Sequence, residues 1–380
     1  MTRRSQAKTK APAVAVVIIG GGVMGCAAAH ELARRGVRVT VLERSVPGAE
    51  ASSAAAGILG AQVESHHPGP LTTLGLLSRK LYPALVKDLE RVSGIAIGYR
   101  RSGVLKVAYE PADLARFGRE LAWQSRAKLQ LARLSRKALL SQEVALSPEL
   151  AGGLWFEDDA TLEPRALLSA LRIAAEKLGA EFRSGSFVKR IATRSGHAVG
   201  VELDDGQLVA GSHVVLAAGS WTSLLTNNEA KTPQVVPARG QIVELKTSAP
   251  LLESIVFGPD CYLVPRPDGR LLIGSTLEFV GFRREVTAGA VAKLLSAAIR
   301  LVPALANAEL SATWSSFRPY THDELPLLGP SATPGLIVMS GHYRNGILLA
   351  PISAQIVADC VQGKKPPLDL TPFAPERIAK

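Results

Sequence analysis

The sequence has 380 residues, of which 47% are hydrophobic and 20% are charged, so the chain can bury a core larger than one ordinary domain and should be folded over most of its length. Its 44 basic and 33 acidic residues give a net charge of +11, but the basic residues are scattered and no RNA-binding signature or zinc finger accompanies them, which argues against nucleic-acid binding. The three cysteines, Cys26, Cys261 and Cys360, are too few and too far apart for a disulfide framework or a zinc site, so we expect no metal and a reducing, cytoplasmic location.

The first feature along the chain is an uncharged run over residues 11–29, which follows a basic stretch and can be read as a signal peptide or a membrane span. Four glycines interrupt this run, at positions 20, 21, 22 and 25, and each would weaken a membrane helix by about 1 kcal/mol. The run continues into a helix-forming stretch at 23–34 and a strand-like stretch at 37–42. We therefore predict a soluble strand, loop, helix and strand, and export is the alternative interpretation.

A dinucleotide-binding motif occupies the loop of this unit. Residues 14–19 form a β-branched apolar run typical of a buried parallel strand, and the spacing of Gly20, Gly22 and Gly25 follows it as G-x-G-x-x-G. The first glycine permits the tight turn, the second lets the backbone approach a pyrophosphate, and the third lets the helix pack closely on the strand. Glu43 ends the second strand, where a carboxylate can accept hydrogen bonds from a ribose diol.

The glycine motif does not distinguish NAD from FAD, because both contain adenosine diphosphate. Residues 52–59, Ser-Ser-Ala-Ala-Ala-Gly-Ile-Leu, are small enough for the backbone to lie against a flat ring system. Runs of small residues also occur in ordinary loops and close-packed helices. By itself this segment therefore suggests a flavin without establishing one.

The rest of the chain indicates interleaved helices and strands. Two hairpins are predicted, around the turns at 204–206 and 267–269, and a buried strand is predicted at 214–217. Helical periodicity is clearest at 76–91, 164–178 and 352–360.

Five stretches, in this order along the chain, resemble the glycine oxidase and D-amino-acid oxidase family of flavoenzymes, and most closely its bacterial members in thiamine biosynthesis. They are residues 16–43, 52–60, 214–222, 261–274 and 341–350, of which the last, Gly-His-Tyr-Arg-Asn-Gly-Ile-Leu-Leu-Ala, is the most specific. The resemblance implies a mixed α/β (α+β) fold, in which a Rossmann-like FAD-binding domain is joined to a substrate domain built on an antiparallel sheet. Sarcosine-oxidase relatives carry a cysteine that bonds the flavin near the position of Arg318, and this chain has none there. We therefore expect non-covalent FAD.

The order of these stretches predicts a discontinuous domain organisation. We expect an FAD-binding domain at 13–90, 150–235 and 320–366, and a substrate-binding domain at 91–149 and 236–319. Residues 1–12 are expected to form a basic disordered tail and residues 367–380 a C-terminal tail.

The cofactor-binding residues follow from the motif and the resemblance together. They are Gly20, Gly22, Val23, Met24, Gly25, Glu43, Arg44, Ser52, Ser53, Ala56, Gly57, Ile58, Val188, Gly219, His342, Tyr343, Arg344, Asn345, Gly346, Ile347 and Leu348. Residues 341–348 are expected to border the flavin, with Gly346 allowing close approach to the ring.

An amino-acid substrate presents a carboxylate, for which a planar, permanently charged guanidinium is the best-suited partner. The resemblance assigns Arg344, Arg318 and Tyr262 to substrate binding, and the alternatives are ion pairs for the arginines and an ordinary strand position for the tyrosine. No catalytic acid or base is expected, and Cys261 is interpreted as a small core residue. Leu277 stands where a characterised glycine oxidase type has methionine, and we assign no effect to that exchange.

The resemblance implies an FAD-dependent oxidase that converts glycine, with sarcosine or small D-amino acids, to the imine and 2-oxo acid while O2 becomes H2O2. We expect a homo-oligomer with a thiazole synthase as a further partner. The alternatives are a membrane-associated D-amino-acid dehydrogenase that passes electrons to quinone, its basic surface docking on anionic lipid, and a non-catalytic flavin-binding module.

Overall fold

The computed structural model describes residues 15–225 and 234–378. Its first layer is a six-stranded sheet in the order β18-β19-β12-β1-β2-β8. The strands are β1 (Ala15–Ile19), β2 (Arg38–Glu43), β8 (Glu181–Ser184), β12 (His213–Leu216), β18 (Leu327–Pro330) and β19 (Leu336–Ser340). All neighbouring pairs are parallel except β18 with β19. The central strands β1 and β12 consist mostly of buried β-branched and leucine residues, as a parallel sheet covered on both faces requires.

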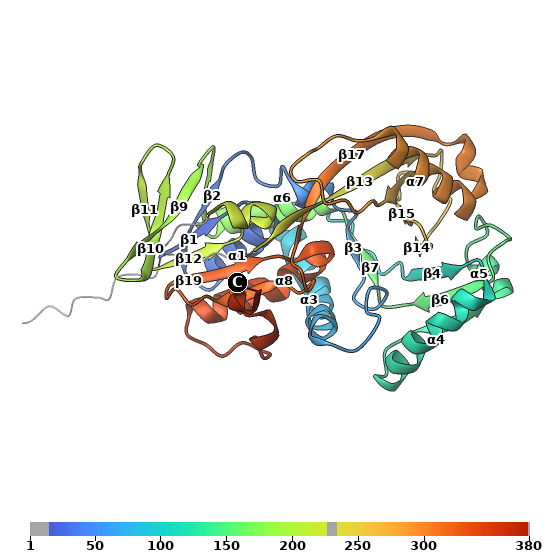
Figure 1. Cartoon of the computed structure of the whole chain (residues 1–380), viewed down its shortest axis with the longest axis horizontal. Helices are drawn as coiled ribbons and strands as arrows, with labels where there is room; N and C mark the ends of the chain where they lie inside the picture. Colours follow the sequence, from blue (N-terminus) through green and yellow to red (C-terminus); the bar gives the residue numbers. More distant parts are fainter. Residues whose placement is uncertain (1–14, 226–233, 379–380) are drawn as a thin grey trace, which may run out of the picture.

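Four helices pack beside this sheet (Figure 1) and contact one another. They are α1 (Val23–Arg34), α3 (Pro70–Ser93), α6 (Pro164–Lys177) and α8 (Gly346–Val361). The helix α1 is buried along its whole length except at Arg34, because α6 and α8 both pack on it. The predicted bounds of α1 are confirmed, whereas α8 begins six residues before the predicted 352.

The second layer is an eight-stranded sheet in the order β17-β13-β16-β15-β14-β4-β6-β5. Its strands are β4 (Val104–Ala108), β5 (Ala132–Ser135), β6 (Gly152–Phe156), β13 (Val236–Lys246), β14 (Ile255–Phe257), β15 (Tyr262–Pro265), β16 (Arg270–Gly274) and β17 (Glu309–Tyr320). All pairs are antiparallel except β14 with β4. The helices of this part are α4 (Pro111–Arg126), α5 (Arg136–Gln142) and α7 (Ala288–Leu301). Residues of α5 and α7 pack into a hydrophobic core separate from that of the first layer.

Smaller elements complete the described chain. A three-stranded sheet of β9 (Val188–Arg194), β10 (His197–Leu203) and β11 (Leu208–Ala210) projects at one end of the molecule (Figure 1). The remaining elements are α2 (Ala51–Ala54), β3 (Ile58–Leu59), β7 (Ala160–Thr161), η1 (Gly219–Leu225), η2 (Pro303–Asn307), η3 (Tyr343–Asn345), η4 (Thr371–Phe373) and η5 (Pro375–Ile378). Both predicted hairpins are present, as β10 with β11 and as β15 with β16. The expected mixed α/β fold with several sheets is confirmed.

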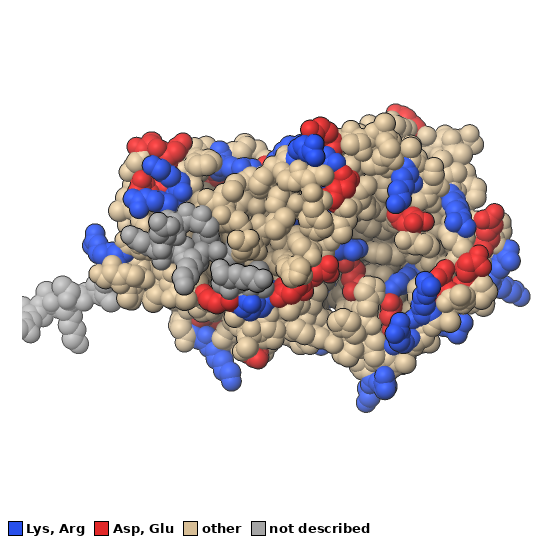
Figure 2. Space-filling model, viewed as in Figure 1, with Lys and Arg blue, Asp and Glu red and all other residues tan. Residues whose placement is uncertain are grey.

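Two further expectations concern the surface. Within residues 15–225 and 234–378, no helix has the length and apolar character needed to cross a membrane. The described part of the 11–29 run, from residue 15 onward, forms β1, the glycine turn and the start of α1. On the face shown in Figure 2, basic and acidic side chains are interspersed. Ion pairs such as Arg101 with Asp158 join oppositely charged side chains of the described surface.

Candidate active site

The turn between β1 and α1 forms one end of the site. Gly20 has a φ of +102°, and a Cβ at this position would lie 2.6 Å from the carbonyl oxygen of Ala217. A Cβ on Gly25 would overlap the carbonyl oxygen of Gly20, so α1 packs here only on a residue without a side chain. The first amide of α1, from Val23, donates to Ser52 Oγ at 2.9 Å. The turn therefore brings backbone amides and the positive end of α1 to a place where an anion can bind.

Glu43 lies beside this turn at the end of β2. Its carboxylate accepts hydrogen bonds from the amide of Gly21 at 2.8 Å and from the amide of Ser45 at 2.9 Å. These bonds fix the carboxylate, and an ionised carboxylate has further lone pairs that can accept hydrogen bonds from a ribose diol.

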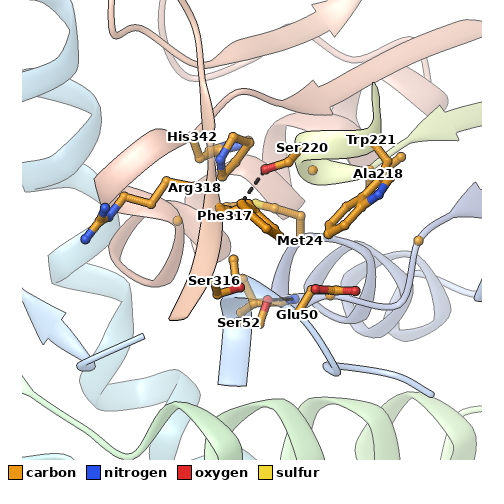
Figure 3. Close-up of a pocket in the computed structure, with 18 of the residues that line it drawn as sticks. Met24, Glu50, Ser52, Ala218, Ser220, Trp221, Ser316, Phe317, Arg318 and His342 are labelled. Carbon is orange, nitrogen blue, oxygen red and sulfur yellow. Dashed lines mark hydrogen bonds between the residues drawn. The ribbon is translucent and has the colours of Figure 1, made fainter. Parts of the chain in front are cut away.

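A cavity of about 410 Å³ connects this turn with the second sheet (Figure 3). The predicted residues that line it are Gly20, Gly22, Val23, Met24, Glu43, Arg44, Ser52, Ala56, Gly57, Ile58, Val188, Gly219, Tyr262, Arg318, His342, Tyr343, Arg344, Gly346 and Ile347. The Ser220 hydroxyl donates to the carbonyl oxygen of Phe317 at 2.9 Å, the dashed line in Figure 3, and so joins η1 to β17 in the wall of the cavity. Segments from both sheets therefore form one site.

Four predicted cofactor residues do not line the cavity: Gly25, Ser53, Asn345 and Leu348. Gly25 contacts the carbonyl oxygen of Gly20 on the side of the turn away from the cavity. Leu348 is buried in the core, where its carbonyl oxygen accepts a 2.6 Å hydrogen bond from Ser78. Successive residues of a helical segment point in different directions, so one face of 342–348 meets the cavity while the other meets the core. A continuous sequence motif does not show this division.

Arg318, on β17, brings an unpaired positive charge to the cavity. Its guanidinium donates to the carbonyl oxygen of Thr276 at 3.1 Å and to the Ser275 hydroxyl. No carboxylate in the described part of the chain lies within ion-pair distance of it. The guanidinium rests against Gly240 on β13, where a Cβ would overlap its nitrogens. Figure 3 places it on the opposite side of the cavity from Trp221, and there a substrate anion can complete its hydrogen bonds.

Tyr262, on β15, also depends on a glycine of the neighbouring strand. It lies opposite Gly274 in the register of β15 with β16, and a Cβ on Gly274 would overlap the phenol ring and its hydroxyl. Tyr262 is half-buried and lines the same cavity as Arg318. Tyr262 and Arg318, two of the three predicted substrate residues, therefore occupy space that glycine leaves open.

Arg344 differs from Arg318 because it already has an acidic partner. Its Nε lies 3.3 Å from Glu64 Oε2, its side chain is 47% exposed, and the negative charge of Glu64 raises its pKa. The ion pair considered as an alternative for Arg344 is thus present, although both side chains also line the cavity. Leu277 is half exposed and is not part of the lining.

Two buried polar atoms of the lining lack a partner in the described structure, Ser316 Oγ and His342 Nδ1. The other ring nitrogen of His342, Nε2, lies 3.0 Å from Ser353 Oγ, and burial lowers the pKa of His342 to about 3. The imidazole is therefore neutral, and in either tautomer Nδ1 is available to a ligand. Orphaned polar atoms in a largely apolar cavity fit a flavin, whose ring edges and ribityl hydroxyls can donate and accept hydrogen bonds.

Several residues that line the cavity are not among the site residues predicted from the sequence. The Arg44 guanidinium lies over the Trp221 ring, 4.0 Å from its centroid, and Phe282 also stacks on this ring at a centroid distance of 5.1 Å. Glu50 pairs with Arg44 at 2.7 Å and with Arg284 from the second layer. Trp221 lies within the quoted 214–222 stretch, so it could have been singled out, but no motif marks Glu50.

None of the three cysteines lines the cavity. Burial raises the pKa of Cys26 and Cys261 to about 12 and that of Cys360 to about 11, so all three remain protonated thiols near neutral pH. The described lining of this cavity therefore contains neither a thiolate nucleophile nor a cysteine that could bond a flavin.

Nucleotide binding at the β1–α1 turn needs only the first sheet, whereas the cavity continues under the second sheet and there provides space for a flavin ring. This arrangement is that of a flavin-dependent enzyme. Residues 15–360 match the family described as FAD dependent oxidoreductase, and the chain belongs to this family. The expected family and the expected cofactor, FAD, are confirmed.

The chain is similar both to proteins named glycine oxidase and to proteins named bifunctional protein ThiO/ThiG. It is 39% identical to the glycine oxidase of Geobacillus kaustophilus over 94% of this chain and 96% of that protein. The crystal structure of a glycine oxidase from the same organism superposes with a TM-score of 0.92 at 38% identity, over 96% of this chain and 99% of that one. The chain is also 39% identical to the bifunctional protein ThiO/ThiG of Synechocystis, over 96% of this chain but only 54% of that protein. It therefore spans about half the length of the bifunctional relative.

Proposed function

We propose that this protein is an oxidase that converts glycine, and with lower preference sarcosine or small D-amino acids, to the imine and then the 2-oxo acid, while O2 is reduced to H2O2. The observation that carries this proposal is the unpaired guanidinium of Arg318, which shares a cavity with the dinucleotide turn and with Tyr262. The names of the relatives, glycine oxidase among them, support the choice of substrate.

The cofactor roles follow from the placement of each segment. The β1–α1 turn and Ser52 are suited to the pyrophosphate, and Glu43 is suited to the ribose. Residues 56–58 and the cavity-facing side of 342–347 are proposed to border the ring system. Since no cysteine lines the cavity, we propose that FAD is bound non-covalently, and acid precipitation of the protein should release all of the flavin into the supernatant.

FAD held by these residues would supply the two-electron oxidation of the substrate and the transfer of the electrons to O2. The chain's own residues position the substrate: Arg318 and Tyr262 bind the carboxylate and so orient the α-carbon, while the apolar lining excludes water. The neutral His342 adds no charge near the reacting groups. No lining side chain is required as an acid or base if the amine is unprotonated when it reacts.

We also propose the division of labour between the layers. The six-stranded sheet and its helices form the FAD-binding part, and the eight-stranded sheet forms the substrate-binding part. The strand β6 pairs within the second sheet, so the proposed boundary lies after residue 156 instead of at 150. A cytoplasmic location and a homo-oligomer remain proposals, which fractionation and light scattering can test.

A further partner is proposed from the bifunctional relative, whose name joins ThiO and ThiG in one chain. An imine of glycine is small and hydrolyses readily, so direct transfer to a thiazole synthase would protect it. Isotope-labelled glycine, supplied to both proteins together, should label the thiazole more efficiently than free glyoxylate and ammonia do.

The proposed activity is tested with purified, FAD-loaded protein. Glycine should bleach the flavin absorbance without oxygen and should yield one H2O2 per substrate oxidised in air. No bleaching and no peroxide with glycine, sarcosine or D-alanine would refute the proposal. Slow reaction with oxygen together with rapid dye reduction would instead identify the quinone-linked dehydrogenase.

A further inference from the structure

The acidic side chains that line the cavity differ in how many hydrogen bonds and ion pairs their carboxylates make. The lining contains Glu43, Glu50 and Glu64. Two backbone amides hold Glu43, and two arginines hold Glu50. The carboxylate of Glu64 makes one 3.3 Å ion pair with Arg344 and no side-chain hydrogen bond in the described part of the chain. Among the carboxylates of this lining, that of Glu64 has the most acceptor capacity left for a ligand.

The backbone around Glu64 is nevertheless firmly placed. The amides of Gln62 and Val63 donate to the fully buried carboxylate of Asp159, at 3.1 and 2.8 Å. The Glu64 amide itself donates to the carbonyl oxygen of Gly60 at 3.4 Å. Glu64 therefore presents a loosely partnered carboxylate from a fixed segment, as a binding residue requires.

The carboxylate of Glu64 lines the cavity together with Arg318 and Arg344. Glu64 Oε2 lies 3.3 Å from Arg344 Nε, and Tyr262 lines the same cavity. Arg318 and Arg344 together contribute two positive charges there, and Glu64 contributes one negative charge. The surplus positive charge suits a substrate carboxylate, but it repels the ammonium group of an amino acid unless a carboxylate lies nearer to that group.

We infer that Glu64 binds the α-ammonium group of the substrate and thereby selects amino acids over carboxylic acids that lack an amine. This inference rests on the proposed function, since it concerns how the same substrate is recognised. In this arrangement the substrate carboxylate completes the hydrogen bonds of Arg318, and the ammonium group donates to Glu64 on binding. The ammonium group then releases one proton to solvent before the amine reacts, so no side chain has to act as a base. The simpler alternative is that Glu64 only positions Arg344.

Glu64→Gln tests the inference, because it removes the charge and keeps the size of the side chain. The matched control is Glu324→Gln: the charge of Glu324 also influences Arg344, but this side chain is exposed and does not line the cavity. The two ligands compared are glycine and acetate, which share the carboxylate and differ in the ammonium group. With FAD-loaded protein, the KM for glycine comes from peroxide release, and the Kd for acetate comes from its perturbation of the flavin spectrum.

We expect Glu64→Gln to raise the KM for glycine about tenfold or more, as loss of a hydrogen bond to a charged group implies, while the Kd for acetate stays unchanged or falls. Glu324→Gln should change both values by less than about threefold. Equal weakening of glycine and acetate in Glu64→Gln would overturn the inference and assign Glu64 to positioning Arg344. An equal rise in the glycine KM in the control would also overturn it.

The proposed function can fail separately. If the wild-type protein does not oxidise glycine, the oxidase proposal is refuted, and glycine becomes an unreactive ligand. Its equilibrium titration can then be compared with that of acetate in the same variants, and the two outcomes described for Glu64→Gln keep their meaning.

Discussion

Replacement of Arg318 by methionine should remove most substrate binding without removing FAD. The guanidinium is half-buried, lines the cavity, and donates to Thr276 and Ser275 while no acidic side chain of the described chain pairs with it. Methionine keeps much of the length and volume but neither the charge nor the donors. Because Arg318 lies on the opposite side of the cavity from Trp221 (Figure 3), we expect FAD binding to be unaffected.

The size of the effect follows from the kind of contact. Loss of one partner from a desolvated, hydrogen-bonded charge pair costs about 2–5 kcal/mol. That range corresponds to a fall in kcat/KM of about 30- to 4,000-fold. Arg344→Met should cost less, up to about fivefold, because Arg344 is 47% exposed and already paired with Glu64. The two variants should therefore rank in that order.

A glycine variant separates the position of the charge from its presence. A Cβ on Gly240 would overlap the end of the Arg318 side chain, which is flexible, so Gly240→Ala should fold normally and displace the guanidinium. Steady-state peroxide release gives kcat/KM, and the ratio of flavin to protein absorbance gives FAD content. We expect both Arg318→Met and Gly240→Ala to lose kcat/KM at full FAD content. Unchanged kcat/KM in Arg318→Met, or a parallel loss of FAD, would refute the assignment of Arg318 to the substrate.

Three further results are expected. Gly25→Ala places a methyl group against the carbonyl oxygen of Gly20, so both the FAD content and the Tm should fall. Full FAD content would show that the β1–α1 turn does not form the nucleotide-binding part of the site. Trp221→Ala removes the ring that contacts Arg44 and Phe282. The loss of about 1–2 kcal/mol of binding free energy should weaken FAD binding about 5- to 30-fold in a fluorescence titration. Unchanged FAD affinity would argue against a role for these contacts. Burial lowers the pKa of His342 from 6.5 to about 3, so the neutral ring stabilises the fold above about pH 6.5, and this contribution is lost by about 1.4 kcal/mol per pH unit as the pH falls towards 3. His342→Gln should flatten the measured pH dependence of the unfolding free energy in that window, and an identical slope would show that the ring is protonated in the folded state.

The features that the sequence predicts well are local ones. The glycine spacing at 20–25 and the helix at 23–34 depend on turn geometry and on helix propensity, which act over a few residues. The hairpin around 267–269 is predictable for the same reason, since its turn residues determine the pairing of the adjacent strands. The family resemblance extends the prediction to long stretches of the chain. Most of the cofactor residues predicted from the motif and the resemblance line one cavity.

The contacts that decide what each side chain does are long-range, and the sequence does not show them. Arg318 and Arg344 are equivalent as isolated arginines, yet the fold brings Glu64 to one of them and only neutral acceptors to the other. Such pairing depends on how the 61–64 turn is anchored by Asp159, a contact that no spacing in the sequence encodes. The sequence can therefore assign both arginines to the substrate, but it does not show which of them already has an acidic partner.

The substrate end also illustrates how strand register creates space. In the register of β15 with β16, Tyr262 faces Gly274, and on β13 the missing side chain of Gly240 leaves room for the guanidinium of Arg318. Neither glycine has a positive φ, so the backbone conformation alone does not require glycine at these positions. What requires it is the close approach of a functional side chain from the adjacent strand. Glycines within strands of an antiparallel sheet can thus indicate where a neighbouring strand carries a binding residue, once the register is known.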